Sequence, residues 1–219
     1  MIDGIILDKL NLKAFGDQSS NDWSSEVFNS NVVFRKGMSY LIEAGSGRGK
    51  SSLCSFLCGL RNDYDGTVSY VGDDVQSGVL DDVDYVELRR SSIAVMFQEC
   101  RLFPELTAVE NVMLKSSITG FFKEDEVREM LVRLGLAAHL DRPCAKMSLG
   151  QQQRVAFVRA MAQPCDFMLL DEPVSHLDEK NASVVAGMLS ERQRKDGVGV
   201  IVTSVGYSLP YEYDKVLKL

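Results

Sequence analysis

Short apolar runs alternate along the chain with longer segments in which apolar residues recur at helical spacing. The first pattern predicts strands and the second predicts amphipathic helices. Their alternation predicts an α/β fold with a mainly parallel sheet. The expected strands are Ile2–Leu7, Val32–Arg35, Ser39–Ala44, Thr67–Val71, Ser92–Phe97, Phe167–Leu170 and Val198–Thr203. The expected helices are Lys50–Leu60, Thr107–Lys115, Lys123–Leu134, Leu149–Ala162 and Glu179–Lys195.

The middle of the chain differs from its two ends. From about Gln98 to Met161 no convincing strand is present, whereas strands precede and follow this stretch. We therefore expect a helical subdomain, about residues 98–161, inserted in the core of a single domain that spans residues 1–219. The sequences Thr107-x-x-Glu110 and Ser148-x-x-Gln151 have the form of capping boxes, so they are expected to begin helices.

Composition narrows the class of protein. The 219 residues are 45% hydrophobic and 25% charged, which is typical of a globular chain and excludes a disordered or coiled-coil protein. The net charge of −7 and the lack of a basic run argue against a nucleic-acid partner. No apolar stretch reaches the roughly 20 residues of a spanning helix, and the N-terminus does not resemble a signal peptide. A cytoplasmic chain is the expectation.

Cysteine usage points the same way. The five cysteines contain no C-x-x-C pair, so neither a disulfide framework nor a zinc site is indicated. Cys54 and Cys58 are four residues apart on one expected helix face, and we expect them to be small buried hydrophobic side chains.

The first chemical signal is a glycine-rich segment between an expected strand and an expected helix. Backbone N–H groups of such a loop converge on phosphate oxygens, and the helix N-terminus adds positive potential. In this pattern Lys50 reaches the β- and γ-phosphates, and the Ser51 hydroxyl ligates Mg²⁺. Ala44 stands where the pattern has its first glycine. A glycine-rich turn with a chance Lys-Ser is the alternative, but the strand–loop–helix context favours a phosphate loop. The expected nucleotide-binding residues here are Gly45, Ser46, Gly47, Arg48, Gly49, Lys50, Ser51 and Ser52.

A second signal lies at the end of the apolar strand Phe167–Leu170, which is followed by Asp171 and Glu172. A carboxylate at this strand end suits Mg²⁺ that is also held by a hydroxyl and phosphate oxygens, and Asp171 supplies it. Glu172 can orient or deprotonate an attacking water. Alone, an apolar strand that ends in two acidic residues is weak evidence for a site. The pattern becomes significant here because a phosphate loop precedes it in the chain.

Together these segments resemble the ATP-binding subunit of ABC transporters. This resemblance implies a P-loop NTPase core with an N-terminal antiparallel β portion. The resemblance covers nearly the whole chain and is carried by further segments in the family's order. These are Phe97-Gln98, the run from Leu102 to Val112, the run from Met147 to Val155, and Ser175-His176-Leu177-Asp178.

The resemblance implies two chains packed head to tail around two ATP molecules with Mg²⁺, and a separate transmembrane permease as partner. Ser148, Gly150 and Gln151 are then signature residues that face the ATP held by the opposite chain. Gln98 resembles a glutamine of the Mg²⁺ and water network, which makes Glu172, Gln98 and Lys50 the expected catalytic residues and Ser51, Gln98 and Asp171 the expected metal site. Asp178 resembles an aspartate that contacts the opposite chain.

Adenine in this family stacks on an early aromatic residue. Phe15, before Gly16, fits this pattern, and Trp23 is the alternative. For each of them an ordinary core or surface role stays open.

Two departures from the family pattern bear on activity. Leu149 replaces the first glycine of the signature, and Ser204 stands after the last apolar strand, where the family has a histidine that touches the γ-phosphate. The histidines of the chain, His139 and His176, do not follow that strand. Serine has a shorter reach and no titratable charge near neutral pH, so hydrolysis is expected to be slower or to depend on Glu172 alone.

The resulting hypothesis is an ATP-binding and ATP-hydrolysing transporter subunit, cytoplasmic and peripheral on the inner face of the membrane through its partner. The short C-terminal part resembles the compact subunits of the lipoprotein-release and macrolide-efflux type. A nucleotide-gated binding module with weak or lost hydrolysis is the alternative. A soluble cassette of translation or DNA repair fits less well, since those resemble paired cassettes or carry long coiled-coil inserts.

Overall fold

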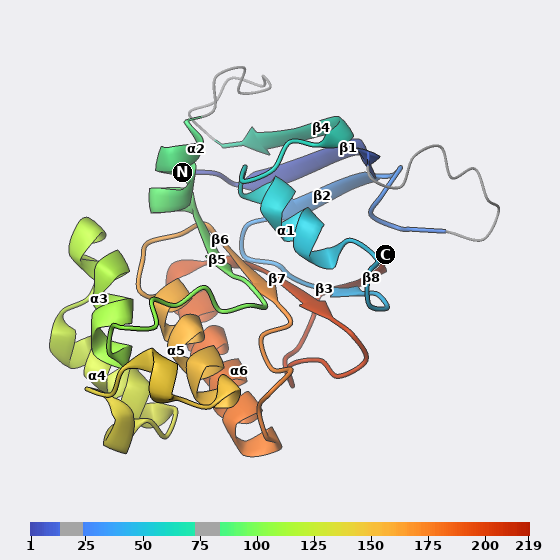
Figure 1. The fold of residues 1–219 in the computed structure, drawn as a ribbon. Helices are drawn as coiled ribbons and strands as arrows, with labels where there is room; N and C mark the ends of the chain where they lie inside the picture. Colours follow the sequence, from blue (N-terminus) through green and yellow to red (C-terminus); the bar gives the residue numbers. More distant parts are fainter. Residues whose placement is uncertain (14–23, 73–83) are drawn as a thin grey trace.

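The computed structural model describes residues 1–13, 24–72 and 84–219 (Figure 1). Within these residues a five-stranded sheet has the order β5-β6-β7-β3-β8, and all of its neighbouring strands are parallel. Its strands are β3 (Ser39–Glu43), β5 (Ile93–Met96), β6 (Phe167–Asp171), β7 (Gly199–Ser204) and β8 (Lys215–Lys218). The expected mainly parallel sheet is confirmed, whereas β8 was not predicted.

A second sheet is antiparallel and is formed by the early strands. Its order is β2-β1-β4, with β1 (Gly4–Leu12) in the centre, paired with both β2 (Asn31–Arg35) and β4 (Tyr64–Val71). The pairing of β1 with β4 shifts register between Asp8 and Asn11. The N-terminal antiparallel portion is therefore confirmed, and β1 and β4 are longer than their apolar runs predicted.

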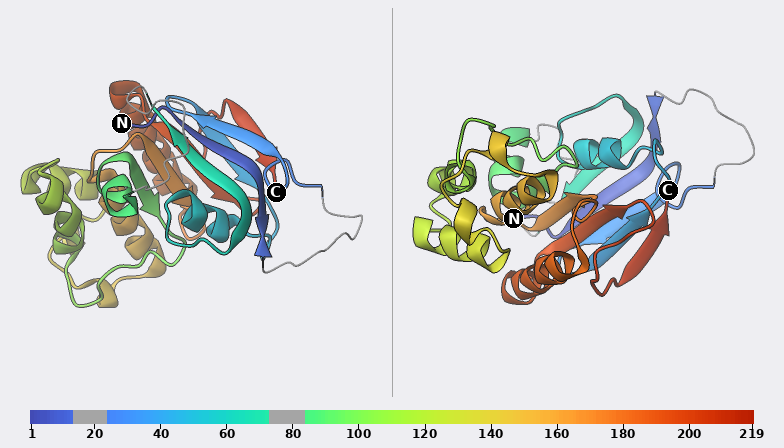
Figure 2. Two further views of the ribbon diagram at one scale, coloured as in Figure 1. Left: turned by 90° about the horizontal axis from the view of Figure 1, so that it is seen from above. Right: turned by 60° about the horizontal axis from the view of Figure 1, so that its bottom comes forward.

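The helices lie on both sides of the parallel sheet (Figures 1 and 2). Helix α1 (Lys50–Leu57) packs between the parallel and antiparallel sheets, in one core cluster with residues of β1, β3 and β6. The helices on the opposite face are α3 (Ala108–Thr119), α4 (Glu124–Arg133), α5 (Leu149–Met161) and α6 (Glu179–Asp196). Shorter elements in residues 84–219 are α2 (Tyr85–Glu87), a π-helical turn (Leu88–Ser92) and 3₁₀ turns at Ala137–His139 and Cys144–Lys146, none of which was predicted.

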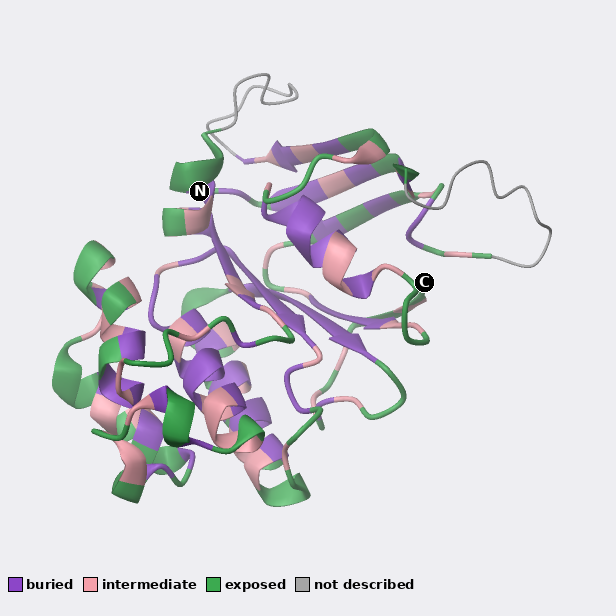
Figure 3. Cartoon of the chain, in the orientation of Figure 1, coloured by how far each residue is buried: buried purple, intermediate pink, exposed green. Residues whose placement is uncertain are grey.

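Strand β6 illustrates why the central strands read as continuous apolar runs. Met168 and Leu170 belong to the core shared with the helices, while Phe167 and Leu169 belong to the core shared with α1 and the antiparallel sheet. Alternate residues of a strand point to opposite faces, and here both faces are covered. Figure 3 shows the buried strands at the centre of the molecule.

Residues 97–166 contain no strand, as expected, and only one isolated bridge, between Thr107 and Pro143. Both predicted capping boxes are present: Thr107 Oγ1 accepts from the Glu110 N–H, and Ser148 Oγ accepts from the Gln151 N–H. Helix α5 contacts α3 and α4 and also β5, so it joins the helical segment to the sheet. No helix in the described part of the chain is long and apolar enough to cross a membrane.

Candidate nucleotide site

The phosphate loop connects the end of β3 to the start of α1. Gly49 directly precedes α1 and has a φ of 92°, a backbone conformation that residues with a Cβ rarely adopt. A Cβ on Gly49 would also lie 2.6 Å from Leu12 Cδ1. The glycine therefore lets the loop turn sharply while it stays packed against the end of β1.

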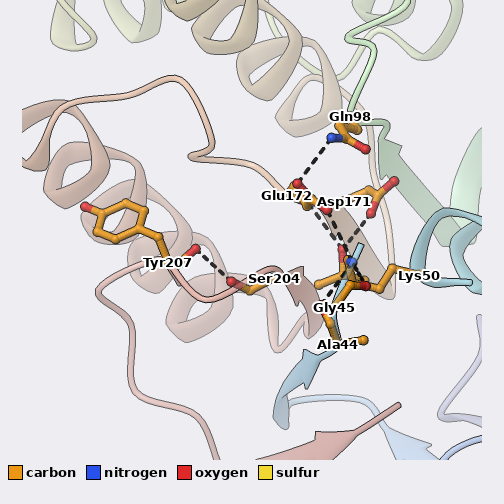
Figure 4. Close-up of polar contacts among 9 residues, drawn as sticks. Ala44, Gly45, Lys50, Gln98, Asp171, Glu172, Ser204 and Tyr207 are labelled. Carbon is orange, nitrogen blue, oxygen red and sulfur yellow. Dashed lines mark hydrogen bonds and ion pairs between the residues drawn. The ribbon is translucent and has the colours of Figure 1, made fainter. Parts of the chain in front are cut away.

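Lys50 is buried at the first position of α1, with only 4% of its surface exposed. Its Nζ donates to the carbonyl oxygens of Ala44 (3.1 Å) and Gly45 (2.9 Å), and it lies 3.5 Å from Glu172 Oε1 (Figure 4). The ammonium group is thus held over the loop and beside the end of β6. A phosphate bound in the loop would meet a fixed positive charge there.

A cavity of about 370 Å³ lies above the loop. It brings together residues from three parts of the sequence that were predicted separately: the loop, Gln98 after β5 and Glu172 after β6. Gly45 and Arg48 do not line it, although Gly45 contributes the carbonyl that holds Lys50. Its lining residues are Leu12, Ser46, Gly47, Gly49, Lys50, Ser51, Ser52, Gln98, Glu172 and Val205.

Asp171, the last residue of β6, is fully buried. Its Oδ1 accepts a hydrogen bond from Thr203 Oγ1 on β7 at 2.6 Å, whereas its Oδ2 is buried without a hydrogen-bond partner. A buried carboxylate oxygen that no donor satisfies suits a metal ion or a metal-bound water. Asp171 and Ser51 therefore fit Mg²⁺ chemically.

The described residues contain no group of three or more His, Cys, Asp or Glu side chains that could hold a metal. Mg²⁺ commonly binds through one or two protein groups, substrate phosphates and water. The carboxylate of Asp171 and the hydroxyl of Ser51 are a donor pair of this kind, which leaves the remaining Mg²⁺ positions to nucleotide phosphates and water.

Glu172 has an unusual backbone conformation, with φ 49°. A residue other than glycine in this region costs on the order of 1–3 kcal/mol and persists only where surrounding contacts hold it. Its N–H donates to the Thr203 carbonyl at 3.2 Å. The carboxylate is held at both oxygens, since Oε1 lies near Lys50 and Oε2 accepts from Gln98 Nε2 at 3.2 Å.

The signature residues form a separate group at the start of α5. Ser148 caps the helix, Gln151 completes the capping box, and a Cβ on Gly150 would lie 2.6 Å from the His176 carbonyl oxygen. Leu149, the departure from the family pattern, is 62% exposed and points outward. The capping box is local to this helix start, since the Ser148 N–H donates to Gln151 Oε1 at 2.9 Å and the Gln151 N–H donates to Ser148 Oγ at 3.3 Å.

Asp178 lies at the start of α6 and has a local role in the chain. Its side chain caps the helix by accepting from the Asn181 N–H at 2.8 Å, and this contact lowers the pKa of the Asp178 carboxyl. The aspartate remains exposed, so a contact with an opposite chain is sterically open.

Ser204 does not face the cavity. It is 2% exposed, and its Oγ donates to the Tyr207 carbonyl at 2.7 Å (Figure 4). The next residue, Val205, lines the cavity instead. Both candidate adenine-stacking residues, Phe15 and Trp23, lie outside the described residues.

Two residues that hold the site were not predicted. Thr203 bonds Asp171 and the backbone of Glu172, and Gln153 on α5 donates to the Glu172 carbonyl at 2.9 Å. A polar residue at the end of the apolar run of β7, and a glutamine at an apolar position of a helix, were signals available in the sequence.

The five cysteines are free and buried, and the burial of Cys54 and Cys58 is as expected. Burial, with a smaller contribution from the charge of Asp171, raises the pKa of Cys54 beneath the loop, and burial raises the pKa of Cys100 to about 11. Both thiols stay protonated near neutral pH, so they supply no nucleophile to the site.

The close approach at Gly150 gives a test of the packing between α5 and the segment after β6. Gly150→Ala is expected to destabilise the chain by about 1–3 kcal/mol, because the new methyl group meets backbone that cannot yield cheaply. Gly187→Ala on α6 is the control, since its Cβ would meet nothing within 4 Å. That change should stabilise by about 0.5–1 kcal/mol. Urea unfolding measures both, and equal effects would refute the close packing.

A glycine-rich loop at a helix start, a buried lysine and a carboxylate-ended strand in one cavity define a P-loop nucleotide-binding protein. The family profile described as ABC transporter matches residues 27–175, and the chain belongs to this family. It is therefore an ATP-binding cassette.

Individual relatives agree with this assignment. The chain is 36% identical over 186 residues to the lipoprotein-releasing system ATP-binding protein LolD of Nitrobacter hamburgensis, covering 84% of this chain and 79% of that protein. It is 32% identical over 191 residues to the uncharacterized ABC transporter ATP-binding protein YbbA of Escherichia coli K12, covering 86% and 83%. The dimeric ATP-binding cassette MJ0796 bound to ADP and Pi superposes with a TM-score of 0.73 at 27% identity, covering 91% and 87%.

Proposed function

We propose that the chain hydrolyses ATP as the nucleotide-binding subunit of an ABC transporter, dimerising around two MgATP molecules to drive a separate membrane protein. The observation that carries this proposal is the cavity in which Lys50, Gln98 and Glu172 meet over the phosphate loop.

The chemistry follows from the groups on the cavity wall. The loop N–H groups and Lys50 would bind the phosphates. Ser51, Asp171 and Gln98 would hold Mg²⁺, which would neutralise the charge that develops on the phosphates. Glu172 orients the attacking water and accepts its proton, while Gln98 holds the carboxylate in place through Oε2. Thr203 fixes Asp171, which leaves Oδ2 available to the metal side of the site.

Dimerisation is supported by the separation of the site into two groups of residues. Ser148, Gly150, Gln151 and Asp178 make local contacts that serve the ends of α5 and α6. An arrangement in which Ser148, Gly150 and Gln151 meet the nucleotide held by a second chain gives the start of α5 an anionic ligand, and Asp178 would contact that second chain. The MJ0796 cassette was solved as a dimer, which agrees with this proposal.

The partner is proposed from the relatives. LolD is named as the ATP-binding protein of a lipoprotein-releasing system, and a comparable role here requires a transmembrane permease. The chain would then sit on the cytoplasmic face of the membrane through that permease, in keeping with the compact lipoprotein-release and macrolide-efflux type.

One observation favours a second candidate function, a nucleotide-gated module with little hydrolysis. The Ser204 hydroxyl donates to the Tyr207 carbonyl, so the side chain at this position does not offer a hydrogen bond to the γ-phosphate held by the same chain. Steady-state phosphate release by the wild-type chain distinguishes the two functions. Turnover that depends on Glu172 supports hydrolysis, and ATP-dependent dimerisation without turnover supports the gated module.

Dimerisation has its own test. Glu172→Gln, which keeps the shape of the site, is expected to sediment at about double the monomer mass in MgATP and as a monomer without nucleotide. The double variant Lys50→Ala, Glu172→Gln is the control and should stay monomeric, because it lacks the phosphate contact. A Glu172→Gln chain that binds ATP and remains monomeric would contradict the sandwich.

A further inference from the structure

Gln153 is a buried polar residue in the first half of α5, and only 1% of its surface is exposed. Its side-chain amide makes hydrogen bonds to the segment that follows β6. Nε2 donates to the Glu172 carbonyl at 2.9 Å and to Ser175 Oγ at 3.0 Å, and Oε1 accepts from the His176 N–H at 3.0 Å. One side-chain amide therefore links the first residue of the segment 172–176 to its last two residues.

The contact at Glu172 acts where the backbone is strained. With φ 49°, the peptide on each side of this residue must be held, and Thr203 binds only the N–H side. Gln153 binds the carbonyl side, together with a longer bond of 3.4 Å from the Ser175 N–H. Since the backbone of Glu172 sets the direction of its side chain, Gln153 influences where the carboxylate lies relative to Lys50 and Gln98.

Helix α5 approaches this segment at two places one turn apart. Gly150 packs against the His176 carbonyl oxygen, and Gln153 binds the backbone of residues 172–176. Residues three apart lie on the same face of a helix, so both contacts move with one face of α5. That helix begins at Ser148, in the group of residues proposed to meet the second nucleotide.

We propose that Gln153 is a positioning residue for ATP hydrolysis. It holds the backbone of Glu172 in its left-handed conformation, and it couples the position of the Glu172 carboxylate to the position of α5. This inference rests on the proposed hydrolysis. The buried amide touches neither the cavity nor the phosphate loop, so it acts through the backbone and leaves nucleotide binding to other residues.

Gln153→Met tests the proposal, because methionine has a length and volume similar to those of glutamine but makes none of its three side-chain hydrogen bonds. The expected result is a decrease in kcat of about 10- to 100-fold, the effect of displacing a catalytic group by about 1 Å. KM and the affinity for ATP should stay within about twofold, because binding is not altered.

Gln152→Met is the matched control. Gln152 is the neighbouring glutamine of the same helix, and its Nε2 donates to the carbonyls of Cys144 and Met147, at 3.1 Å each, away from Glu172. Loss of these bonds should lower stability without lowering kcat by more than about twofold. An unchanged kcat in Gln153→Met, or an equal loss in Gln152→Met, would overturn the proposal.

A second readout separates this proposal from the proposed function. Hydrogen exchange at the His176 amide should be at least about fivefold faster in Gln153→Met than in wild type or Gln152→Met. A wild-type chain that releases no phosphate would count against the proposed hydrolysis, and unchanged exchange would count against Gln153. If Gln153→Met does not fold, Gln153→Asn, which shortens the amide by one methylene, should show the same losses.

Discussion

Glu172→Gln is expected to lower kcat for ATP hydrolysis by about 10²–10⁴-fold, the usual contribution of a positioned general base. The amide keeps the size of the side chain and can still meet Lys50 and Gln98, but it cannot accept a proton from water. Binding of ATP should therefore persist. Steady-state phosphate release together with equilibrium nucleotide binding measures the two effects separately.

Glu129→Gln on α4 is the control for this prediction, because Glu129 is exposed and lies outside the nucleotide cavity. Its kcat should match that of the wild-type chain. Equal phosphate release by Glu172→Gln and wild type would show that Glu172 does not act as the base, and that the observed turnover comes from elsewhere.

Lys50→Ala is expected to weaken ATP binding by about 10- to 150-fold, the equivalent of the 1.5–3 kcal/mol of a hydrogen bond to a charged group. The Lys50 ammonium is already oriented by the carbonyls of Ala44 and Gly45, so its side chain loses little conformational freedom when phosphate binds. Titration of the purified chain with ATP by calorimetry measures the loss.

Lys36→Ala is the control for Lys50. Lys36 Nζ pairs with Asp166 Oδ1 at 2.6 Å, at a second cationic site outside the nucleotide cavity. Its removal should change stability but not ATP affinity. If Lys50→Ala bound ATP as tightly as wild type, the glycine-rich segment would not be the phosphate loop.

The sequence predicted most of what depends on local pattern. The phosphate loop, the carboxylates after β6 and the capping boxes of α3 and α5 are set by residues close together in the chain, and each lies where it was expected. The meeting of Gln98 with Glu172 followed from the family resemblance, since spacing alone does not place β5 beside β6.

What escaped prediction depends on packing between distant segments. Strand β8 is a short Lys-Val-Leu-Lys segment in which every residue but Leu217 is exposed, and its pairing with β3 makes it a strand. The roles of Thr203 and Gln153 arise because β7 and α5 are brought against the end of β6. The orientation of Ser204 is set by the turn that follows it, which a strand pattern does not contain.

The order of the parallel sheet also determines the width of the site. The loop follows β3 and the carboxylates follow β6, and β7 runs between them. Neighbouring strands are about 4.8 Å apart, so the two halves of the site stand about 10 Å apart at the edge of the sheet. Lys50 and Glu172 reach across that gap because both side chains are long.

The strand in the gap ends in two short hydroxyl side chains, Thr203 and Ser204, each turned to a partner beside it. Neither of these side chains lines the cavity, and Val205, which follows directly after the strand, lines it instead. Strand β7 therefore separates the two halves of the site without placing a side chain of its own in the cavity.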